Sequence, residues 1–278
     1  MSDNFKKEFF STLLILRDYL SDIVIAGGWA PLIYYHYLVS DKTREPLRTK
    51  DIDIVVPERL EKKSNKTIDK ILTEAGFKIN FRSRHSIPIV SYVGTIGDFK
   101  VEIEFLTHRR SDKDGQVAVV QEGLHAQLLS FINVLLENSI TVDINDFKLE
   151  DGEFLKIRVP TPGAYIFQKV LIVTRRTRRV KSAKDLYYIF DILSTCEILH
   201  SQIAKDICSF RTSYPVKWSR QFLRDLKTHF SDVNGNGVQL IQSQRPENAF
   251  PSMNNEQFSH YVLGIFQDFI ERIEKDLC

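Results

Sequence analysis

Cysteine is scarce in this chain, and the positions of its three cysteines suggest no covalent framework. Cys196, Cys208 and Cys278 lie in the last third of the sequence, outside any Cys-x-x-Cys pair and away from any pair of histidines. Zinc sites use such spacings, and disulfides are rare in reducing compartments. The cysteines therefore predict free thiols, with no structural disulfide and no structural zinc.

Long apolar runs are also missing. No stretch approaches the roughly 20 apolar residues that a membrane-spanning helix needs, and no signal-peptide-like segment follows the lysines near Met1. The net charge of +2 does not by itself indicate a nucleic-acid-binding protein. Neither a Gly-x-Ser-x-Gly motif nor a Walker-type lysine loop occurs, which argues against serine hydrolases and P-loop enzymes. We expect a soluble, cytoplasmic protein with no membrane partner.

The segment 160–163, Pro-Thr-Pro-Gly, is the clearest break in the chain. Before it, short apolar or alternating runs predict strands at 23–26, 51–56, 78–81, 87–93, 99–106, 140–144 and 154–159, and helices at 5–20, 29–38 and 63–75. After it, helical periodicity covers 164–173, 183–196, 198–210, 220–230 and 255–276, and the polar stretch 234–251 predicts a flexible loop. The expected fold is α+β, with a mixed β-sheet and flanking helices in residues 1–160 and an all-helical domain in residues 161–278.

Two carboxylates share the strand predicted at 51–56. Asp51 and Asp53 alternate with Ile52 and Ile54, so both acids project from one face, about 7 Å apart along the pleat. Paired carboxylates suit a hard divalent cation. Taken alone, the same alternation also fits the solvated face of an ordinary half-buried strand.

A glycine pair precedes this strand. Gly27 and Gly28 follow an apolar run and open the helix predicted from Trp29. Such a turn exposes backbone N–H groups and the positive end of a helix to phosphate, although glycine pairs also mark ordinary turns. The order of glycine turn, helix and paired acids is what favours a site for phosphate and metal.

A third acid, which a two-metal site needs, is available on the strand 99–106. Glu102 and Glu104 lie on one face of this strand. Either glutamate also fits an exposed surface position. We favour Glu104, because the following Phe105 and Leu106 end the strand where a site at the sheet edge would lie.

Together these residues resemble the polymerase-β-type nucleotidyltransferase superfamily. The matching segments are Gly27-Gly28-Trp29-Ala30, Arg48-Thr49-Lys50-Asp51-Ile52-Asp53-Ile54 and Glu104-Phe105-Leu106. The Arg-Thr-x-Asp-hydrophobic-Asp form is similar to the bacterial branch that includes abortive-infection, toxin-type proteins. The chain departs from the common pattern in having Gly28 where many members have Ser, a longer segment between Gly28 and Asp51, and Glu as the third acid.

The resemblance implies a mechanism. Two Mg²⁺ ions held by Asp51, Asp53 and Glu104 would activate the attacking hydroxyl and neutralise the leaving pyrophosphate. The backbone at Gly27 and Gly28 would hold the outer phosphates of ATP or another NTP. Arg48 and Thr49 would also contribute to nucleotide binding.

A basic segment opens the helical half. Its cations are Lys169, Arg175, Arg176, Arg178, Arg179, Lys181 and Lys184. Two acids, Asp185 and Asp191, lie at the end of the segment. The segment fits a solvated helix face, or a phosphate-binding edge for the NTP or for the backbone of an RNA acceptor. By the resemblance, Lys169 contacts the triphosphate and Asp185 positions a base or a basic partner. Arg175 and Arg176 are predicted to bind nucleotide, although the choice among the arginines stays open.

The sequence thus predicts a Mg²⁺-dependent nucleotidyltransferase that moves an NMP from an NTP to a hydroxyl. The acceptor could be RNA or tRNA, a protein or a small molecule. The alternative is a non-catalytic nucleotide-binding module, half of a toxin–antitoxin or regulatory pair with a protein partner.

Overall fold

The computed structural model describes residues 2–63, 65–82, 89–108, 116–176 and 179–277. The chain forms two compact units. Unit 1 comprises residues 1–30 and 48–160, and unit 2 comprises residues 31–47 and 161–278. The chain therefore enters unit 2 once, over residues 31–47, before returning to complete unit 1.

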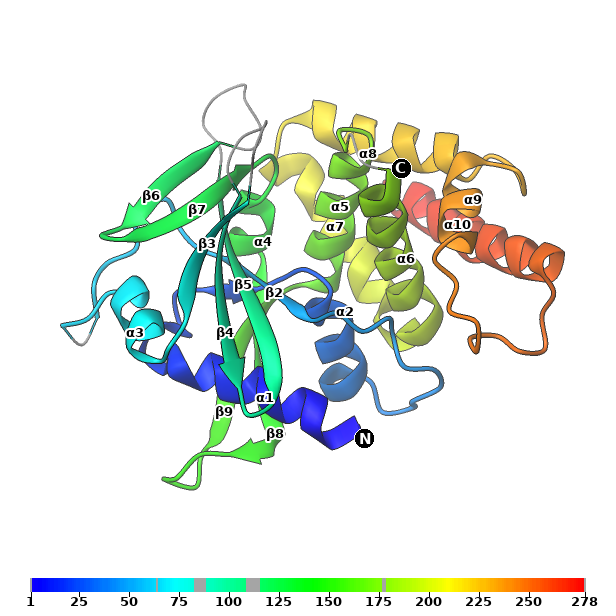
Figure 1. The fold of residues 1–278 in the computed structure, drawn as a ribbon. Helices are drawn as coiled ribbons and strands as arrows, with labels where there is room; N and C mark the ends of the chain where they lie inside the picture. The colour runs from blue at the N-terminus through cyan, green and yellow to red at the C-terminus, as the bar shows by residue number, and fades with distance from the viewer. Residues whose placement is uncertain (1, 64, 83–88, 109–115, 177–178, 278) are drawn as a thin grey trace. The chain divides into compact units, whose positions relative to one another are not determined.

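A seven-stranded mixed sheet forms the centre of unit 1 (Figure 1). Five strands follow the order β1 (Val24–Ile25), β2 (Asp51–Val55), β5 (Phe99–His108), β4 (Ile89–Ile96) and β3 (Lys78–Arg82). β2 and β5 are parallel, whereas β5, β4 and β3 form an antiparallel meander. β7 (Leu124–Leu129) pairs in parallel with the end of β5 and antiparallel with β6 (Val117–Gln121).

The alternating sequences of the central strands bury one face of this sheet. Ile52 and Ile54 of β2 and Ile103 and Phe105 of β5 are almost completely buried. The intervening acids lie on the opposite face, because successive side chains of a strand point in opposite directions. Unit 1 is completed by α1 (Ser2–Ile15), α3 (Ile68–Glu74), α4 (Asn133–Glu137) and a second, two-stranded sheet of β8 (Ser139–Lys148) and β9 (Phe154–Pro160).

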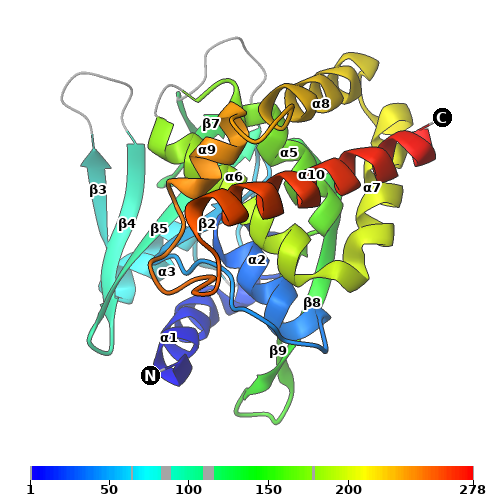
Figure 2. The same cartoon turned by 90° about the vertical axis from the view of Figure 1, so that its right-hand side faces the viewer.

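Unit 2 is helical. Its helices after residue 160 are α5 (Pro162–Val173), α6 (Arg179–Thr195), α7 (His200–Ser213), α8 (Val216–His229), α9 (Asn236–Gln242) and α10 (Asn255–Leu277). α10 packs against α6 and α7 and runs across them in Figure 2. Buried aromatic rings of Phe167, Phe190, Phe210 and Phe222 fill the interior, and α5 is buried along its whole length.

The predicted fold class is confirmed: a mixed sheet with helices precedes an all-helical region. The flexible loop predicted at 234–251 is wrong in part, because α9 forms inside it and buries Val238, Leu240 and Ile241. The helix predicted at 29–38 is a short α-helix, α2 (Trp29–Ile33), that continues as a π-helical turn over Tyr34–Leu38.

The β6–β7 hairpin was not predicted, and the first residues of the strand predicted at 87–93 lie outside the described residues. Within the described part of the chain, none of the helices has the length and apolar character to cross a membrane.

Candidate active site

The parallel pairing of β2 with β5 aligns the four candidate acids. In the register of this pair, Asp51 lies opposite Glu102 and Asp53 lies opposite Glu104. Paired residues on neighbouring strands point to the same face of the sheet. Asp51 is exposed and the other three acids are half-buried, so all four belong to the face opposite the apolar core.

The glycine turn lies directly against Asp53. β1 pairs antiparallel with β2, and the N–H of Ala26 donates to the backbone carbonyl of Asp53 at 2.8 Å. Gly27 follows in the left-handed region, with φ of +58°. A Cβ added at Gly27 would lie 1.9 Å from Oδ2 of Asp53. Only glycine leaves room for this carboxylate, so the turn and the acid form one local structure.

Helix α2 begins immediately after the glycine turn, and its first residue, Trp29, is held by packing against aromatic rings of α1. The ring of Trp29 stacks on Phe9 with centroids 3.5 Å apart and on Phe5 at 4.7 Å. Trp29 is 3% exposed. This aromatic stack holds the C-terminal side of the glycine turn.

Glu104 and Glu102 differ in their neighbours along the sheet. Glu104 lies between Asp53 of β2 and Ser91 of β4, whereas Glu102 lies between Asp51 and Val93. Glu104 is thus directly opposite Asp53, the acid that lies against the glycine turn, on the neighbouring strand. Both glutamates share the face of the aspartates, and each is aligned with one of them.

The two predicted nucleotide-binding residues before β2 lie in different environments. Arg48 is exposed and its guanidinium lies 5.3 Å from the centre of the Phe5 ring. Thr49 is 6% exposed. Arg48 therefore presents a cation near the start of the acid-bearing strand, and Thr49 is part of the packed interior.

The donor chemistry of the four acids suits Mg²⁺, which prefers carboxylate oxygens and is commonly held by one or two of them together with water and substrate phosphates. Within the described residues, no group of three or more His, Cys, Asp or Glu side chains is arranged to hold a metal ion. The aligned pair of Asp53 and Glu104 fits the smaller requirement of one or two carboxylates.

In unit 2, three of the predicted residues form one buried ionic cluster. Lys169 Nζ lies 2.6 Å from Asp185 Oδ1, and Arg176 Nε lies 3.1 Å from Asp185 Oδ2. Burial alone would raise the pKa of Asp185, but the charges and hydrogen bonds of Lys169 and Arg176 outweigh it and hold the pKa below its usual value. Arg175 is exposed and belongs to the surface. The structure therefore separates the two arginines, which the sequence could not distinguish.

A second buried carboxylate in unit 2 was not assigned a role from the sequence. Asp191 is fully buried; Arg44 Nη2 lies 2.5 Å from its Oδ1, and the N–H of Leu47 donates to Oδ2 at 2.7 Å. Burial raises the pKa of Asp191 to about 6, against the opposing effect of Arg44. The carboxylate fixes the segment 44–47 to α6. No local pattern predicts this contact, because the partners lie far apart in the sequence.

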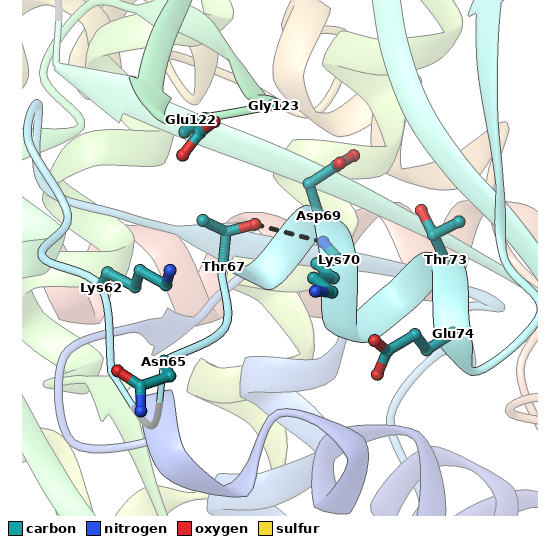
Figure 3. A pocket seen from close by; sticks show the side chains of 9 residues that line it. All are labelled: Lys62, Asn65, Thr67, Asp69, Lys70, Thr73, Glu74, Glu122 and Gly123. Atoms are coloured by element: carbon teal, nitrogen blue, oxygen red, sulfur yellow. Dashed lines mark hydrogen bonds between the residues drawn. The ribbon is translucent and has the colours of Figure 1, made fainter.

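A polar pocket of about 630 Å³ opens beside α3 in unit 1 (Figure 3). Charged side chains of both signs line it, among them Lys62, Asp69, Lys70 and Glu122. None of the predicted catalytic or nucleotide-binding residues is among the described residues that line this pocket. The pocket is therefore separate from the aligned carboxylates.

Comparison with known proteins gives a family. No curated protein matches the chain. The crystal structure of an antigenic nucleotidyltransferase-like protein from Paracoccidioides brasiliensis is similar at 16% identity, over 77% of this chain and 91% of that chain, with a TM-score of 0.35. The model of a family described as Nucleotidyltransferase matches residues 18–206. That match covers more than half of the chain and includes every residue of the candidate site, so the protein belongs to this nucleotidyltransferase family.

Proposed function

We propose that this protein transfers a nucleoside monophosphate from an NTP to a hydroxyl acceptor, in a Mg²⁺-dependent reaction at the acids of β2 and β5. The family match supports nucleotidyl transfer in general. The observation that carries the assignment to these residues is the contact of Gly27 with Asp53, in a strand whose register places Glu104 beside that acid.

Each group has a part in the proposed reaction. Asp53 and Glu104 would hold the cation with carboxylate oxygens, the ligands that Mg²⁺ prefers. Asp51 or Glu102, on the same face, would join them once its side chain turned toward the cation. When bound, Mg²⁺ supplies charge neutralisation and lowers the pKa of a coordinated hydroxyl. The absence of side chains at Gly27 and Gly28 would allow phosphate oxygens to approach the backbone closely.

Lys169, Arg175, Arg176 and Asp185 stay predicted nucleotide-binding residues. In unit 2, Asp185 holds the ammonium of Lys169 and the guanidinium of Arg176 in fixed positions. Preorganised cations of this kind lower the entropic cost of binding a phosphate. Arg175, which is exposed, would reach a phosphate from the surface of unit 2.

The test is pyrophosphate release by the full-length protein, measured with each NTP in turn in the presence of Mg²⁺ and total RNA. We expect release with the wild type, none after chelation with EDTA, and a loss of at least about 100-fold in Asp51→Asn and Asp53→Asn, which corresponds to about 3 kcal/mol in the barrier. The control is Lys70→Ala, which changes an exposed residue of α3 outside the candidate site and should leave the rate unchanged. Equal rates in the wild type and both aspartate variants would refute the assignment.

The alternative function is a non-catalytic nucleotide-binding module, as one half of a toxin–antitoxin or regulatory pair. One observation favours it: within the described residues, the acids are not gathered into a group of three that could hold a metal ion. NTP binding that requires Mg²⁺ but gives no pyrophosphate with any acceptor would support this alternative over the enzyme.

A further inference from the structure

Helix α8 carries a one-sided distribution of charge. Ser219, Phe222 and Leu226 face the interior of unit 2. Lys217, Arg220 and Arg224 are exposed, and their spacing of three and four residues places them along the opposite face. Since a helix rises 5.4 Å per turn, these cations follow one another at about that interval.

The one acid of α8 does not neutralise this face. Asp225 is buried, and it accepts hydrogen bonds from the hydroxyl of Thr174 at 3.4 Å and from the side-chain amide of Gln221 at 3.3 Å. Arg224 Nε lies 3.5 Å from Asp225 Oδ1, but its side chain is 70% exposed. The exposed charged side chains of α8 are therefore all basic; Lys227, near its end, is paired with Glu274 of α10, whereas no ion pair of Lys217 or Arg220 occurs among the described residues.

The bond from Thr174 also connects α8 to a second group of cations. α5 packs against α8, and the two helices lie next to each other in both views (Figures 1 and 2). Thr174 is the C-cap of α5, and the hydroxyl of Ser182 in α6 donates to the carbonyl of Val173 at 3.4 Å. The start of α6 is thus held at the same end of α5.

Exposed basic residues at this end of α5 extend the charge of α8. We call the combined set the basic surface; its members are Arg175, Arg179, Lys181, Lys217, Arg220 and Arg224, and all are exposed. The chain as a whole has a net charge of only +2. The basic surface is therefore a local concentration of charge within one unit rather than a consequence of composition.

An aromatic pair lies at the start of α8. The rings of Tyr214 and Trp218 are stacked, with centroids 5.5 Å apart and planes 15° from parallel, and both residues are half-buried. Cations that follow a phosphate backbone, together with aromatic rings that stack on bases, are the combination that binds single-stranded nucleic acids.

We propose that the basic surface binds single-stranded RNA, which is the acceptor of the nucleotidyl group. This inference rests on the proposed function for the role of the RNA, since an RNA end offers the hydroxyls that the reaction consumes. The contacts are to phosphates and ring faces, so binding is strongly salt-dependent and largely independent of sequence. The basic surface lies wholly in unit 2, whereas the acids proposed for catalysis lie in unit 1.

The test measures the binding of a fluorescein-labelled single-stranded RNA of 20 nucleotides to the full-length protein. Binding is measured by fluorescence anisotropy at KCl concentrations between 50 and 200 mM. The first variant is Lys217→Ala, Arg220→Ala, Arg224→Ala, and the second is Arg175→Ala, Arg179→Ala, Lys181→Ala. Each should weaken binding at least tenfold at 50 mM KCl. Each should also reduce the slope of log K against log salt by about 2, because single strands give roughly 0.7 per phosphate contact.

A matched control removes three exposed cations from unit 1: Arg59→Ala, Lys62→Ala, Lys70→Ala. It should bind as the wild type does, and so should Asp53→Asn. Thermal unfolding of every variant identifies any that fails to fold, and the two surface variants provide independent tests.

RNA binding that is absent, that is insensitive to salt, or that weakens equally in the control would overturn the proposal. Displacement of the RNA by phosphatidylserine vesicles at equal anionic charge would also overturn it and assign the surface to membranes. If RNA binds through the basic surface but no NTP is turned over, the proposed function fails, and the acceptor role of the RNA fails with it, while RNA binding by the basic surface stands. If NMP is transferred only to acceptors other than RNA, and RNA does not bind, this inference fails alone.

Discussion

Gly27→Ala tests the contact between the glycine turn and the acid-bearing strand. Gly27 has a φ of +58°, a conformation that costs a residue with a Cβ about 1–2 kcal/mol. The added Cβ would also lie 1.9 Å from Oδ2 and 2.7 Å from Cγ of Asp53. Such overpacking typically costs about 1–3 kcal/mol more, and the carboxylate must move to relieve it.

Gly97→Ala is a closely matched control. Gly97 has a φ of +57°, and a Cβ there would meet nothing within 4 Å. The two variants therefore share the backbone strain, and only Gly27→Ala displaces the carboxylate of Asp53. In urea unfolding, we expect Gly27→Ala to lose more free energy of unfolding than Gly97→Ala.

The rates of pyrophosphate release should also differ between Gly27→Ala and Gly97→Ala. A displacement of about 1 Å in a catalytic group can cost 100-fold in rate. We expect Gly97→Ala to keep wild-type activity and Gly27→Ala to lose at least that factor. Adding Asp53→Ala to Gly27→Ala removes Oδ2 and Cγ but leaves the backbone strain and the Cβ of residue 53 at 2.9 Å. The double variant should therefore recover part of the lost stability without recovering activity. If the two glycine variants lose the same stability and the same activity, the contact with Asp53 is irrelevant to function.

Three further perturbations have defined outcomes. Glu104→Gln should slow pyrophosphate release by on the order of 100-fold, and by more than Glu102→Gln does, because Glu104 shares a row with Asp53; the reverse order would make Glu102 the third acid. Asp185→Leu should lower the free energy of unfolding by about 3 kcal/mol, because it leaves the 8%-exposed Lys169 buried without its carboxylate. Adding Lys169→Met should recover most of that loss in urea unfolding, and no recovery would contradict the pairing. The pKa of Asp191, raised by burial to about 6, means that the folded state keeps this proton at pH values where the unfolded state, with a pKa near 3.8, has lost it. Its contribution to stability is thus present in full below about pH 4 and declines as the pH rises through 6, by about 3 kcal/mol in all. The difference in free energy of unfolding between the wild type and Asp191→Asn should follow this decline, and a difference that is flat or rises with pH would refute it.

The fold was predictable where the sequence pattern is local. Alternation at 51–56 and 99–106 predicted the two central strands, and both form, as β2 and β5. Their parallel register was not predictable, because it is set by packing between segments about 50 residues apart in the sequence. That register is what places Asp53 beside Glu104.

The elements missed from the sequence depend on tertiary contacts or on turns that carry a weak signal. α9 begins inside the sequence Gly235-Asn236-Gly237, which normally indicates a loop. It is helical because it packs against α6 and buries its apolar side chains. The β6–β7 hairpin did carry local signals, namely the β-branched run Val117-Ala118-Val119-Val120 and the Glu122-Gly123 turn, but no strand was predicted from them.

The ionic contacts of unit 2 also depend on tertiary structure that the sequence pattern does not reveal. The sequence identified the cluster of cations around Arg175 and Arg176 but could not separate the arginine that pairs with Asp185 from the exposed one. The contact of Arg44 with Asp191 joins a loop to a helix across nearly 150 residues, and no spacing rule reaches that far.

The most direct test of nucleotidyl transfer compares two positions of a label in the same NTP. The full-length protein is incubated with Mg²⁺, total RNA and an NTP carrying ³²P at the α- or at the γ-phosphate. We predict that label from the α-phosphate becomes attached to an acceptor while label from the γ-phosphate leaves in pyrophosphate, and that Asp51→Asn with Asp53→Asn abolishes both. Transfer of the γ-label to an acceptor, or undiminished α-labelling by the double variant, would contradict the central claim.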